Sequence, residues 1–361
     1  MMRLGFTVTC LLCMVGSTIR APKMTPAEEL LQLIEKSVKK GLIMFGHQDD
    51  TAYGKNWRFE KGRSDVFEVV NDYPAVCGWD LGGIELNDSL NIDKIPFRLI
   101  RSLIKEQHQR GGINAISWHL RNPENDNDTW TVGGRVVASV LPGGANHEKY
   151  TGWLDHAAGF LLSMRDEDGQ LIPVIFRPFH EHTGSWFWWG KDWCTTGEYQ
   201  ALWRFIHEYF TRKGLNNLVW AYSPGSEGDA TEYMERFPGR GYTDMLGLDI
   251  YQFNGAQGAG DYMKLLHQKL AEITELGKKS DLPVALTETG LEGVVMPEWW
   301  TGVLWTTVRE FPLSYVLVWR NAWDREGHFY APYPDQISAG NFIEFYQLPE
   351  TAFVKDVARL R

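Results

Sequence analysis

The chain has 361 residues, and 43% of them are hydrophobic, so it is long enough to bury one large core. The formal net charge of −10 argues against nucleic acid as a partner, because binding to phosphates needs a basic surface. The 16 Trp outnumber the 14 Tyr, and many of the Trp stand beside polar residues. Since the apolar face of a sugar ring stacks on indole, this composition favours a carbohydrate ligand over a merely Trp-rich core.

The start of the chain has the pattern of a secretory signal peptide, which we expect over residues 1–20. A short basic start precedes a mostly apolar run from Leu4 to Ile19, which is too short for a typical membrane span. Residues 21–361 would then form a single catalytic domain, secreted across the inner membrane to the periplasm or the extracellular space. Cys10 and Cys13 keep a lipoprotein anchor open as an alternative. Without a lipid we expect no stable membrane partner, and we expect a monomer.

Apolar, β-prone runs alternate with amphipathic patterns along the rest of the chain. The expected strands are Leu42–Gly46, Ala75–Trp79, Ile113–Trp118, Ile172–Phe176, Leu218–Tyr222, Met245–Ile250, Val284–Thr287 and Tyr315–Trp319. The expected helices are Thr25–Lys40, Pro96–Gln109, His147–Arg165, Gly197–Lys213, Thr231–Arg236, Tyr262–Lys278, Pro297–Glu310 and Glu350–Leu360, the first of them capped by Thr25 and opened by Pro26. This alternation predicts an α/β fold with parallel strands, and a closed (β/α)8 TIM barrel is its natural form. An open doubly wound sheet is the alternative.

Polar or aromatic side chains follow seven of the expected strands, whereas the residues that lead into the strands show no such pattern. They are His47, Gln48, Asp49, Asp50; Trp79, Asp80; Trp118, His119, Asn122; Arg177, His180, Glu181, Trp186; Asp249, Tyr251; Glu288; and Trp319, Arg320, Asn321. In a barrel of parallel strands these ends meet at one rim, where active sites lie. The longest irregular stretch, Arg121–Asn146, follows the third strand and is long enough to be functional.

Two glutamates, Glu181 and Glu288, each end an expected strand and together indicate glycoside hydrolysis. In that reaction one carboxylic acid donates a proton to the leaving oxygen while an ionised carboxylate attacks the sugar. We expect Glu181 to be the acid, because Trp186 and nearby aromatic residues would desolvate it and raise its pKa. The expected hydrogen-bond partners of Glu288 are its neighbours Thr287 and Thr289 and, from other strands, Tyr251 and Arg177.

Two other classes of protein are alternatives to a glycoside hydrolase: a metal-dependent enzyme and a non-catalytic sugar-binding module. His180-Glu181-His182, or His47 with Asp49 and Asp50 as in a metal-dependent polysaccharide deacetylase, could suggest a metal site, but the first lacks the helical His-Glu-x-x-His spacing. A non-catalytic sugar-binding module would keep the aromatic residues, yet nothing in it would require both Glu181 and Glu288.

Several motifs resemble glycoside hydrolase family 26, whose members are mostly β-mannanases. They are Arg177-Pro-Phe-His-Glu181, Gly184-x-Trp186-Phe-Trp-Trp-Gly190, Thr287-Glu-Thr-Gly290, Gly46-His-Gln48, Trp118-His119, Asn122-Pro123, Asp249-Ile-Tyr251 and Trp319-Arg320-Asn321. The resemblance covers nearly the whole mature chain. It implies retaining hydrolysis of β-1,4 linkages in mannan, galactomannan or glucomannan, with no cofactor and no metal, and with β-mannan or manno-oligosaccharides as the bound partner. Mixed-linkage β-glucan or xylan is the alternative substrate within the family.

By the same resemblance, Glu181 would be the acid/base on the fourth strand and Glu288 the nucleophile on the seventh. The residues around the sugar at the cleavage point would be His119, His180, Tyr251 and Trp319, with Trp186 on the leaving-group side; the further expected substrate contacts are Arg177, Asp249, Arg320, Asn321 and Trp130. His182-Thr183 departs from the Met-Asn that commonly follows the acid/base, which affects the leaving-side contacts. Whether attack is endo or releases mannobiose from chain ends depends on loops such as Arg121–Asn146, and both modes stay open.

Overall fold

The computed structural model describes residues 23–361, and the expected signal peptide at residues 1–20 lies outside them. Parallel strands close into a barrel because the last of them, β10, pairs with β1 as well as with β9. The barrel strands are β1 (Ile43–Gln48), β4 (Val76–Asp80), β5 (Ile113–Trp118), β6 (Val174–Pro178), β7 (Leu218–Tyr222), β8 (Met245–Gln252), β9 (Val284–Leu291) and β10 (Leu313–Val318). This confirms the α/β barrel and excludes the open sheet.

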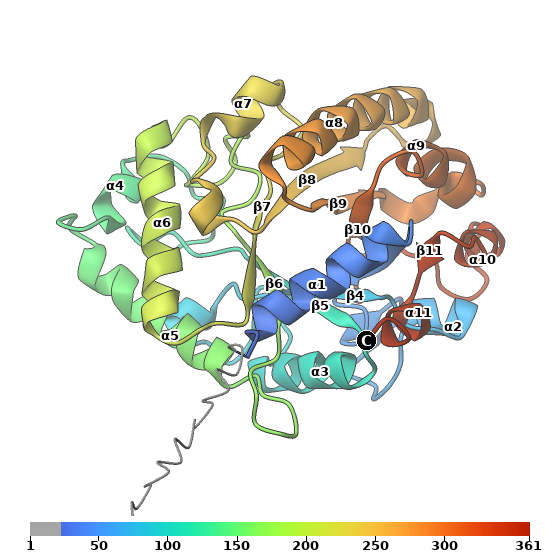
Figure 1. Cartoon of the computed structure of the whole chain (residues 1–361), viewed down its shortest axis with the longest axis horizontal. Helices are drawn as coiled ribbons and strands as arrows, with labels where there is room; N and C mark the ends of the chain where they lie inside the picture. Colours follow the sequence, from blue (N-terminus) through green and yellow to red (C-terminus); the bar gives the residue numbers. More distant parts are fainter. Residues whose placement is uncertain (1–22) are drawn as a thin grey trace, which may run out of the picture.

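Helices surround the barrel (Figure 1). The long ones are α1 (Pro26–Lys39), α3 (Phe97–Gln109), α5 (His147–Leu162), α6 (Thr196–Arg212) and α8 (Ala259–Ser280); short ones are α2 (Asp65–Val70), α4 (Val136–Val140), α7 (Ala230–Glu235), α9 (Thr306–Val308), α10 (Ala339–Tyr346) and α11 (Val354–Ala358). Thr25 caps α1 in a capping box with Glu28, as its position before Pro26 predicts. Within residues 23–361, no helix combines the length and the apolar character that a membrane span requires.

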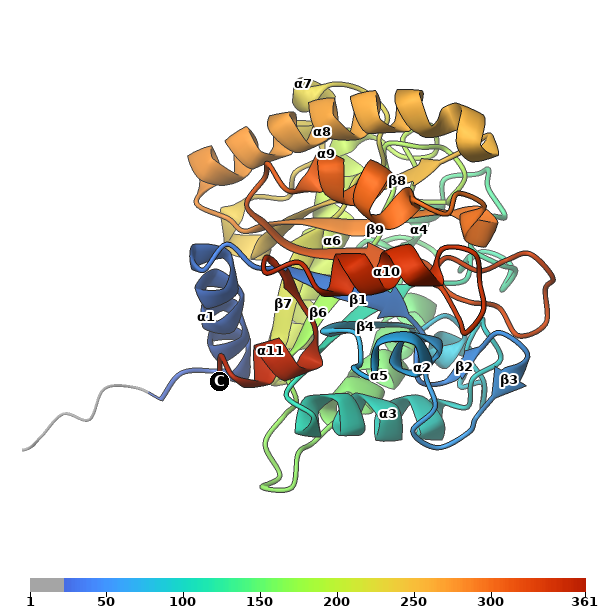
Figure 2. The ribbon, with the colours of Figure 1, turned by 90° about the vertical axis from the view of Figure 1, so that its right-hand side faces the viewer.

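The core has an inner and an outer layer, since side chains alternate between the two faces of each strand. Apolar side chains such as Met44, Val219 and Ala285 fill the barrel, and Leu30 and Ile34 of α1 belong to the same buried cluster. The larger cluster lies between the strands and the surrounding helices. Helix α1 crosses the end of the barrel where the strands begin, and the long loops lie at the opposite end (Figure 2). One end is therefore closed, and the other is free for chemistry.

Three expectations about local structure were wrong or incomplete, and several short elements were not predicted. The stretch Arg121–Asn146 is not wholly irregular, because it contains α4. The expected final helix Glu350–Leu360 begins instead with a short strand, β11 (Thr351–Ala352), which pairs with β1, and only then forms α11. The expected helix Pro297–Glu310 is largely a π-helical turn, η5 (Trp299–Trp305). The helices α2 and α10 and the hairpin β2–β3 (Tyr53–Gly54, Trp57–Arg58) were not predicted, because elements this short carry almost no periodic signal.

Candidate active site

Three carboxylates meet at the open end of the barrel. Glu181 follows β6, Asp249 lies on β8 and Glu288 on β9, so all three stand at or near the carboxyl ends of their strands. One carboxylate oxygen from each residue lies within 4.8 Å of the other two. Each is therefore within the electrostatic field of the others, and their charges must be balanced by nearby donors and cations.

Glu288 is buried and its two oxygens have different donors. The guanidinium group of Arg177 donates to Oε1, and the Tyr251 hydroxyl donates to Oε2 at 2.8 Å. Both bonds favour the ionised carboxylate, because a positive charge and an O–H donor stabilise negative charge. The expected partners from other strands are thus present, and they leave Glu288 as a charged, oriented group.

The flanking threonines do not contact Glu288, and that expectation was wrong. The Thr287 hydroxyl donates to Asp249 Oδ1 at 2.7 Å, and the Thr289 hydroxyl pairs with that of Tyr262 on α8 at 2.5 Å. Asp249 also binds Arg177, whose Nη1 donates to Oδ2 at 2.7 Å. Arg177 therefore lies between two buried carboxylates, and Thr287 contributes by orienting the second of them.

Glu181 has the environment of a carboxyl group that retains its proton. Burial raises its pKa well above the ordinary value, and the neighbouring carboxylates of Glu288 and Asp249 raise it further. Against these effects, the indole N–H of Trp186 donates to Glu181 Oε2 at 2.7 Å and favours the ionised form. The contrast with Glu288, which accepts from Arg177 and Tyr251, separates the two glutamates into an acid and an anion.

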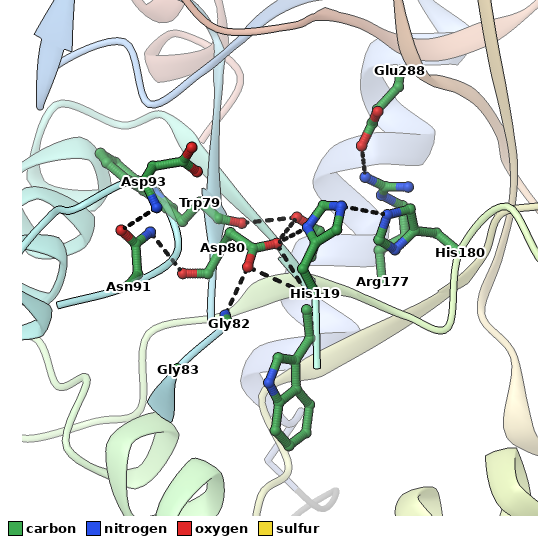
Figure 3. Close-up of polar contacts among 12 residues, drawn as sticks. Trp79, Asp80, Gly82, Gly83, Asn91, Asp93, His119, Arg177, His180 and Glu288 are labelled. Atoms are coloured by element: carbon green, nitrogen blue, oxygen red, sulfur yellow. Dashed lines mark hydrogen bonds and ion pairs between the residues drawn. The ribbon is translucent and has the colours of Figure 1, made fainter. Parts of the chain in front are cut away.

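A buried relay of polar groups supports His119 at the floor of the site (Figure 3). Asp80, at the end of β4, contacts His119 Nδ1 at 2.7 Å, and His119 Nε2 lies 3.3 Å from Nε2 of His180. Burial alone would lower the pKa of His119, but the Asp80 carboxylate raises it above its ordinary value. Burial, together with the positive charge of Arg177, lowers the pKa of His180 well below that value. Of the two rings, His119 is therefore the one more readily protonated, and His180 favours the neutral form.

Aromatic side chains form the rim above this floor. Trp130 is 47% exposed and stacks on the His119 ring with centroids 5.4 Å apart. Trp186 is 39% exposed, and Trp319 has its ring 6.3 Å from that of His119. Arg320 stands beside Trp319 in the chain and forms an ion pair with Asp93 at 3.2 Å. Partly exposed indoles beside buried polar groups are the arrangement expected of a sugar-binding cleft.

Not every strand-end residue that the sequence indicated faces this cleft. Asn321 is fully buried, and its side chain anchors a loop: Nδ2 donates to Asp65 and to the carbonyl of Ala331, while Oδ1 accepts the backbone N–H groups of Tyr330 and Ala331. Both the nitrogen and the oxygen of its amide already bind protein groups, so the expected contact between Asn321 and the substrate is wrong. Asn321 holds a loop in place instead. Arg177 and Asp249 are also buried. Arg177 donates hydrogen bonds to Asp249 and to Glu288, as described above.

Two supporting residues were absent from the predicted set of substrate contacts. Asp80 orients His119, and the Ser223 hydroxyl donates to Asp249 Oδ1 at 2.9 Å. Both follow directly from their position at the end of a strand: Asp80 is the last residue of β4, and Ser223 comes immediately after β7. The strand-end pattern in the sequence already included Asp80, and it would have included Ser223 if it had been applied to β7 as well.

The structure also bears on the metal alternatives. His180 and His182 do not converge: His180 lies beside His119, whereas the His182 ring packs between Tyr199 and Tyr222. Within residues 23–361, the carboxylates of Glu181, Asp249 and Glu288 are the one group of potential ligands close enough to share an ion. Arg177 already donates to Asp249 and Glu288, so a guanidinium group is bound to two of these three carboxylates.

Fold and site together define a class of protein. Two carboxyl groups lie at the mouth of a (β/α)8 barrel, one held as an acid and one as an anion, and one oxygen of each lies within 4.8 Å of an oxygen of the other. A close pair of this kind is the arrangement that a retaining glycoside hydrolase uses. The model of the family described as glycosyl hydrolase family 26 matches residues 21–299. The chain belongs to glycosyl hydrolase family 26.

Solved structures and curated relatives agree with this assignment. The chain is similar to a GH26 β-mannanase from Bacteroides ovatus, with 50% identity and a TM-score of 0.89, over 92% of this chain and 96% of that one. It is also similar to the catalytic domain of a GH26 endo-β-1,4-mannanase from Bacillus sp. JAMB-750, with 31% identity and a TM-score of 0.83, over 93% and 94% of the two chains. A mannan endo-1,4-β-mannosidase from Bifidobacterium adolescentis is 32% identical over 77% of this chain, and one from Bacillus subtilis is 29% identical over 68%. The chain spans 28% and 66% of the lengths of these two relatives.

Proposed function

We propose that the protein is a retaining β-mannanase that hydrolyses β-1,4-mannosidic linkages in mannan, galactomannan or glucomannan. The observation that carries the proposal is the pair Glu181 and Glu288, close together but in opposite protonation environments. The choice of mannan is supported by the names of the relatives, above all the B. ovatus β-mannanase that this chain matches over 96% of its length. These names favour mannan over xylan or mixed-linkage glucan.

In the first step of the proposed mechanism, Glu288 attacks the anomeric carbon and forms a covalent glycosyl-enzyme. Arg177 and Tyr251 hold the attacking carboxylate ionised and oriented. Glu181 gives its proton to the glycosidic oxygen as the bond to the leaving chain breaks, which lowers the barrier because an alkoxide would otherwise leave. Trp186 donates a hydrogen bond to the Glu181 carboxyl group, and the leaving sugar would stack on the exposed part of its indole ring.

In the second step, the same two residues act in reverse. Glu181, now ionised, takes a proton from a water molecule, which attacks the anomeric carbon and releases Glu288. Two inversions restore the β configuration. In this mechanism His119, His180, Tyr251 and Trp319 surround the reacting sugar, and Arg320 and Trp130 are further contacts of the substrate.

The proposal is tested by incubating the purified protein with mannan, xylan and mixed-linkage β-glucan, and by following the first products with proton NMR. We expect rapid hydrolysis of mannan, with the β-anomer appearing first. Equal or faster hydrolysis of xylan or glucan would refute the substrate, and an initial α-anomer would refute the retaining mechanism. Sizing the products over time separates the two modes: internal cleavage gives a ladder of oligosaccharides, whereas attack at chain ends gives mannobiose from the start.

A prediction about pH follows from the bond between Trp186 and Glu181. Trp186→Phe keeps an aromatic face but removes the N–H donor that favours the ionised carboxylate, so the pKa of Glu181 should rise further. Activity needs protonated Glu181 and is lost as the pH rises through this pKa. The basic limb of the kcat/KM profile on mannotetraose should therefore move to higher pH in the variant.

The matched control for this prediction is Trp130→Phe, which alters another rim indole but not a partner of Glu181. It should leave the basic limb where it is in the unchanged protein. A basic limb that moves to lower pH in Trp186→Phe would contradict the assignment of Glu181 as the acid.

A further inference from the structure

The turn that carries Glu181 has an unusual backbone. Phe179 and Glu181 both adopt left-handed conformations, with φ of 49° and 53°, on either side of His180. Side chains with a Cβ rarely adopt such angles, and for a residue as bulky as Phe they are strained. A turn with two such residues persists only where its surroundings hold it. The position of the Glu181 carboxyl group therefore depends on whatever restrains this turn.

Three hydrogen bonds from outside residues 179–184 restrain the backbone of the turn. The Tyr199 hydroxyl donates to the carbonyl of Phe179 at 2.9 Å, and the Trp189 indole donates to the carbonyl of His180 at 2.8 Å. The N–H of Glu181 donates to the carbonyl of Ser223 at 2.8 Å. Tyr199 makes the one bond in this set that a minimal substitution can remove, because Tyr→Phe deletes a single hydroxyl group.

Tyr199 is itself firmly placed. It lies in the first turn of α6, directly after Glu198, which forms a capping box with Thr195. Its hydroxyl is buried, and burial raises its pKa well above the ordinary value, so the group stays protonated and donates. The donor that holds the Phe179 carbonyl thus belongs to the first turn of a regular helix.

Tyr199 also supports the turn from its other side. The ring of His182, the residue after Glu181, packs against Tyr199 with centroids 4.3 Å apart and against Tyr222 at 4.9 Å. His182 is fully buried, and neither of its ring nitrogens has a hydrogen-bond partner among residues 23–361. Burial and the nearby charge of Arg236 lower its pKa well below the ordinary value, so the ring is neutral and fills space between two tyrosines. Tyr199 therefore contacts the chain on both sides of Glu181.

We propose that Tyr199 is a positioning residue for the acid/base: its hydroxyl bond to the Phe179 carbonyl and its ring contact with His182 hold Glu181 at the leaving-group oxygen. The inference rests on the proposed function. Glu288 has separate support from Arg177 and Tyr251, and neither of these contacts Tyr199 through a hydrogen bond in the described structure. Loss of the Tyr199 hydroxyl should therefore weaken proton donation and leave the nucleophile intact.

The test compares two tyrosines of the same cluster. Tyr199→Phe removes the bond to the turn, whereas the control Tyr222→Phe removes an equally buried hydroxyl bond, 2.7 Å long, to the carbonyl of Tyr233 on α7. Each variant is assayed as kcat/KM on mannotetraose, whose leaving sugar needs protonation, and on 2,4-dinitrophenyl β-mannobioside, whose leaving group does not. The value of kcat/KM reports the steps up to cleavage of the glycosidic bond. On the second substrate it therefore depends on the nucleophile and on the fraction of folded protein, but not on the acid.

For Tyr199→Phe we expect kcat/KM on mannotetraose to fall about 10- to 100-fold, since small displacements of a catalytic group have effects of this size. On the dinitrophenyl substrate it should stay within about threefold of the unchanged protein, because that reaction does not need the acid. Tyr222→Phe should affect both substrates equally and little. Glu181→Ala serves as the reference that shows the full difference between the two substrates.

Two results would overturn the inference: an equal loss on both substrates in Tyr199→Phe, which would indicate a role in folding alone, or the same behaviour in Tyr199→Phe and Tyr222→Phe. Failure of the proposed function looks different. In that case the unchanged protein hydrolyses neither substrate, or Glu181→Ala shows no difference between them.

Discussion

Glu181→Ala should lose nearly all activity on mannan but still react with a dinitrophenyl β-mannobioside. Without the proton donor, cleavage of an ordinary sugar linkage should slow by roughly 10²–10⁴-fold. A dinitrophenolate leaves without protonation, so Glu288 can still form the covalent intermediate. Water then attacks slowly because no base activates it, and the released dinitrophenol should appear as a burst followed by a slow phase.

Azide should distinguish the roles of the two glutamates. It needs no base, so it should restore turnover of Glu181→Ala by attacking the glycosyl-enzyme, and the product should be a β-mannobiosyl azide. Glu288→Ala cannot form that intermediate, and azide can at best displace the leaving group directly, which gives the α-azide. Proton NMR of the azide products identifies the anomers.

Two outcomes would contradict this assignment. If the anomers were exchanged between the two variants, the roles of Glu181 and Glu288 would be reversed. If Glu181→Ala kept full activity on mannan, Glu181 would not be the acid at all. The Tyr222→Phe protein, measured with the same substrates, shows the effect of losing a buried hydroxyl group that makes no hydrogen bond to the Glu181 turn.

Arg177→Met should destabilise the fold as well as the site. Arg177 is buried and donates to both Asp249 and Glu288, so its removal leaves two buried carboxylates without their cation. Breaking a buried ion pair in this way typically lowers the free energy of unfolding by about 3–5 kcal/mol. Urea unfolding at pH 7 measures this loss. Activity should fall together with stability, because Glu288 loses a donor that keeps it ionised.

The control is Arg240→Met, which removes a surface pair with Asp281 whose side chains are 55% and 93% exposed. Exposed pairs of this kind contribute about 0–1 kcal/mol. The difference between Arg177→Met and the unchanged protein should also shrink as the pH falls, because Asp249, whose pKa burial raises to about 7, then takes up a proton and needs no cation. A loss no larger than that of the control would show that Asp249 and Glu288 do not depend on Arg177 for their charge balance.

The order and type of the main elements were predictable because their signals are local. Apolar strand runs, the Thr25-Pro26 start of α1 and the spacing between strands follow from short stretches of chain. The same holds for the positions of Glu181 and Glu288, because the carboxyl end of a parallel strand lies at the open end of the barrel. The failures were equally physical. β11 forms because it pairs with β1, and a two-residue strand is too short to have a sequence pattern that predicts this pairing.

By itself, the sequence determined the barrel, its open end, the two glutamates and, through their motifs, the family. Only the tertiary structure decided which side chains support them. Successive residues in a strand point to opposite faces, so Thr289 meets Tyr262 of α8, and the donors to Glu288 come from other strands. Asn321 also comes shortly after a strand, but its loop folds back and buries it. Contacts between residues distant in sequence depend on the closure of the barrel and on the paths of its loops. Neither of these can be predicted from the spacing of residues along the chain.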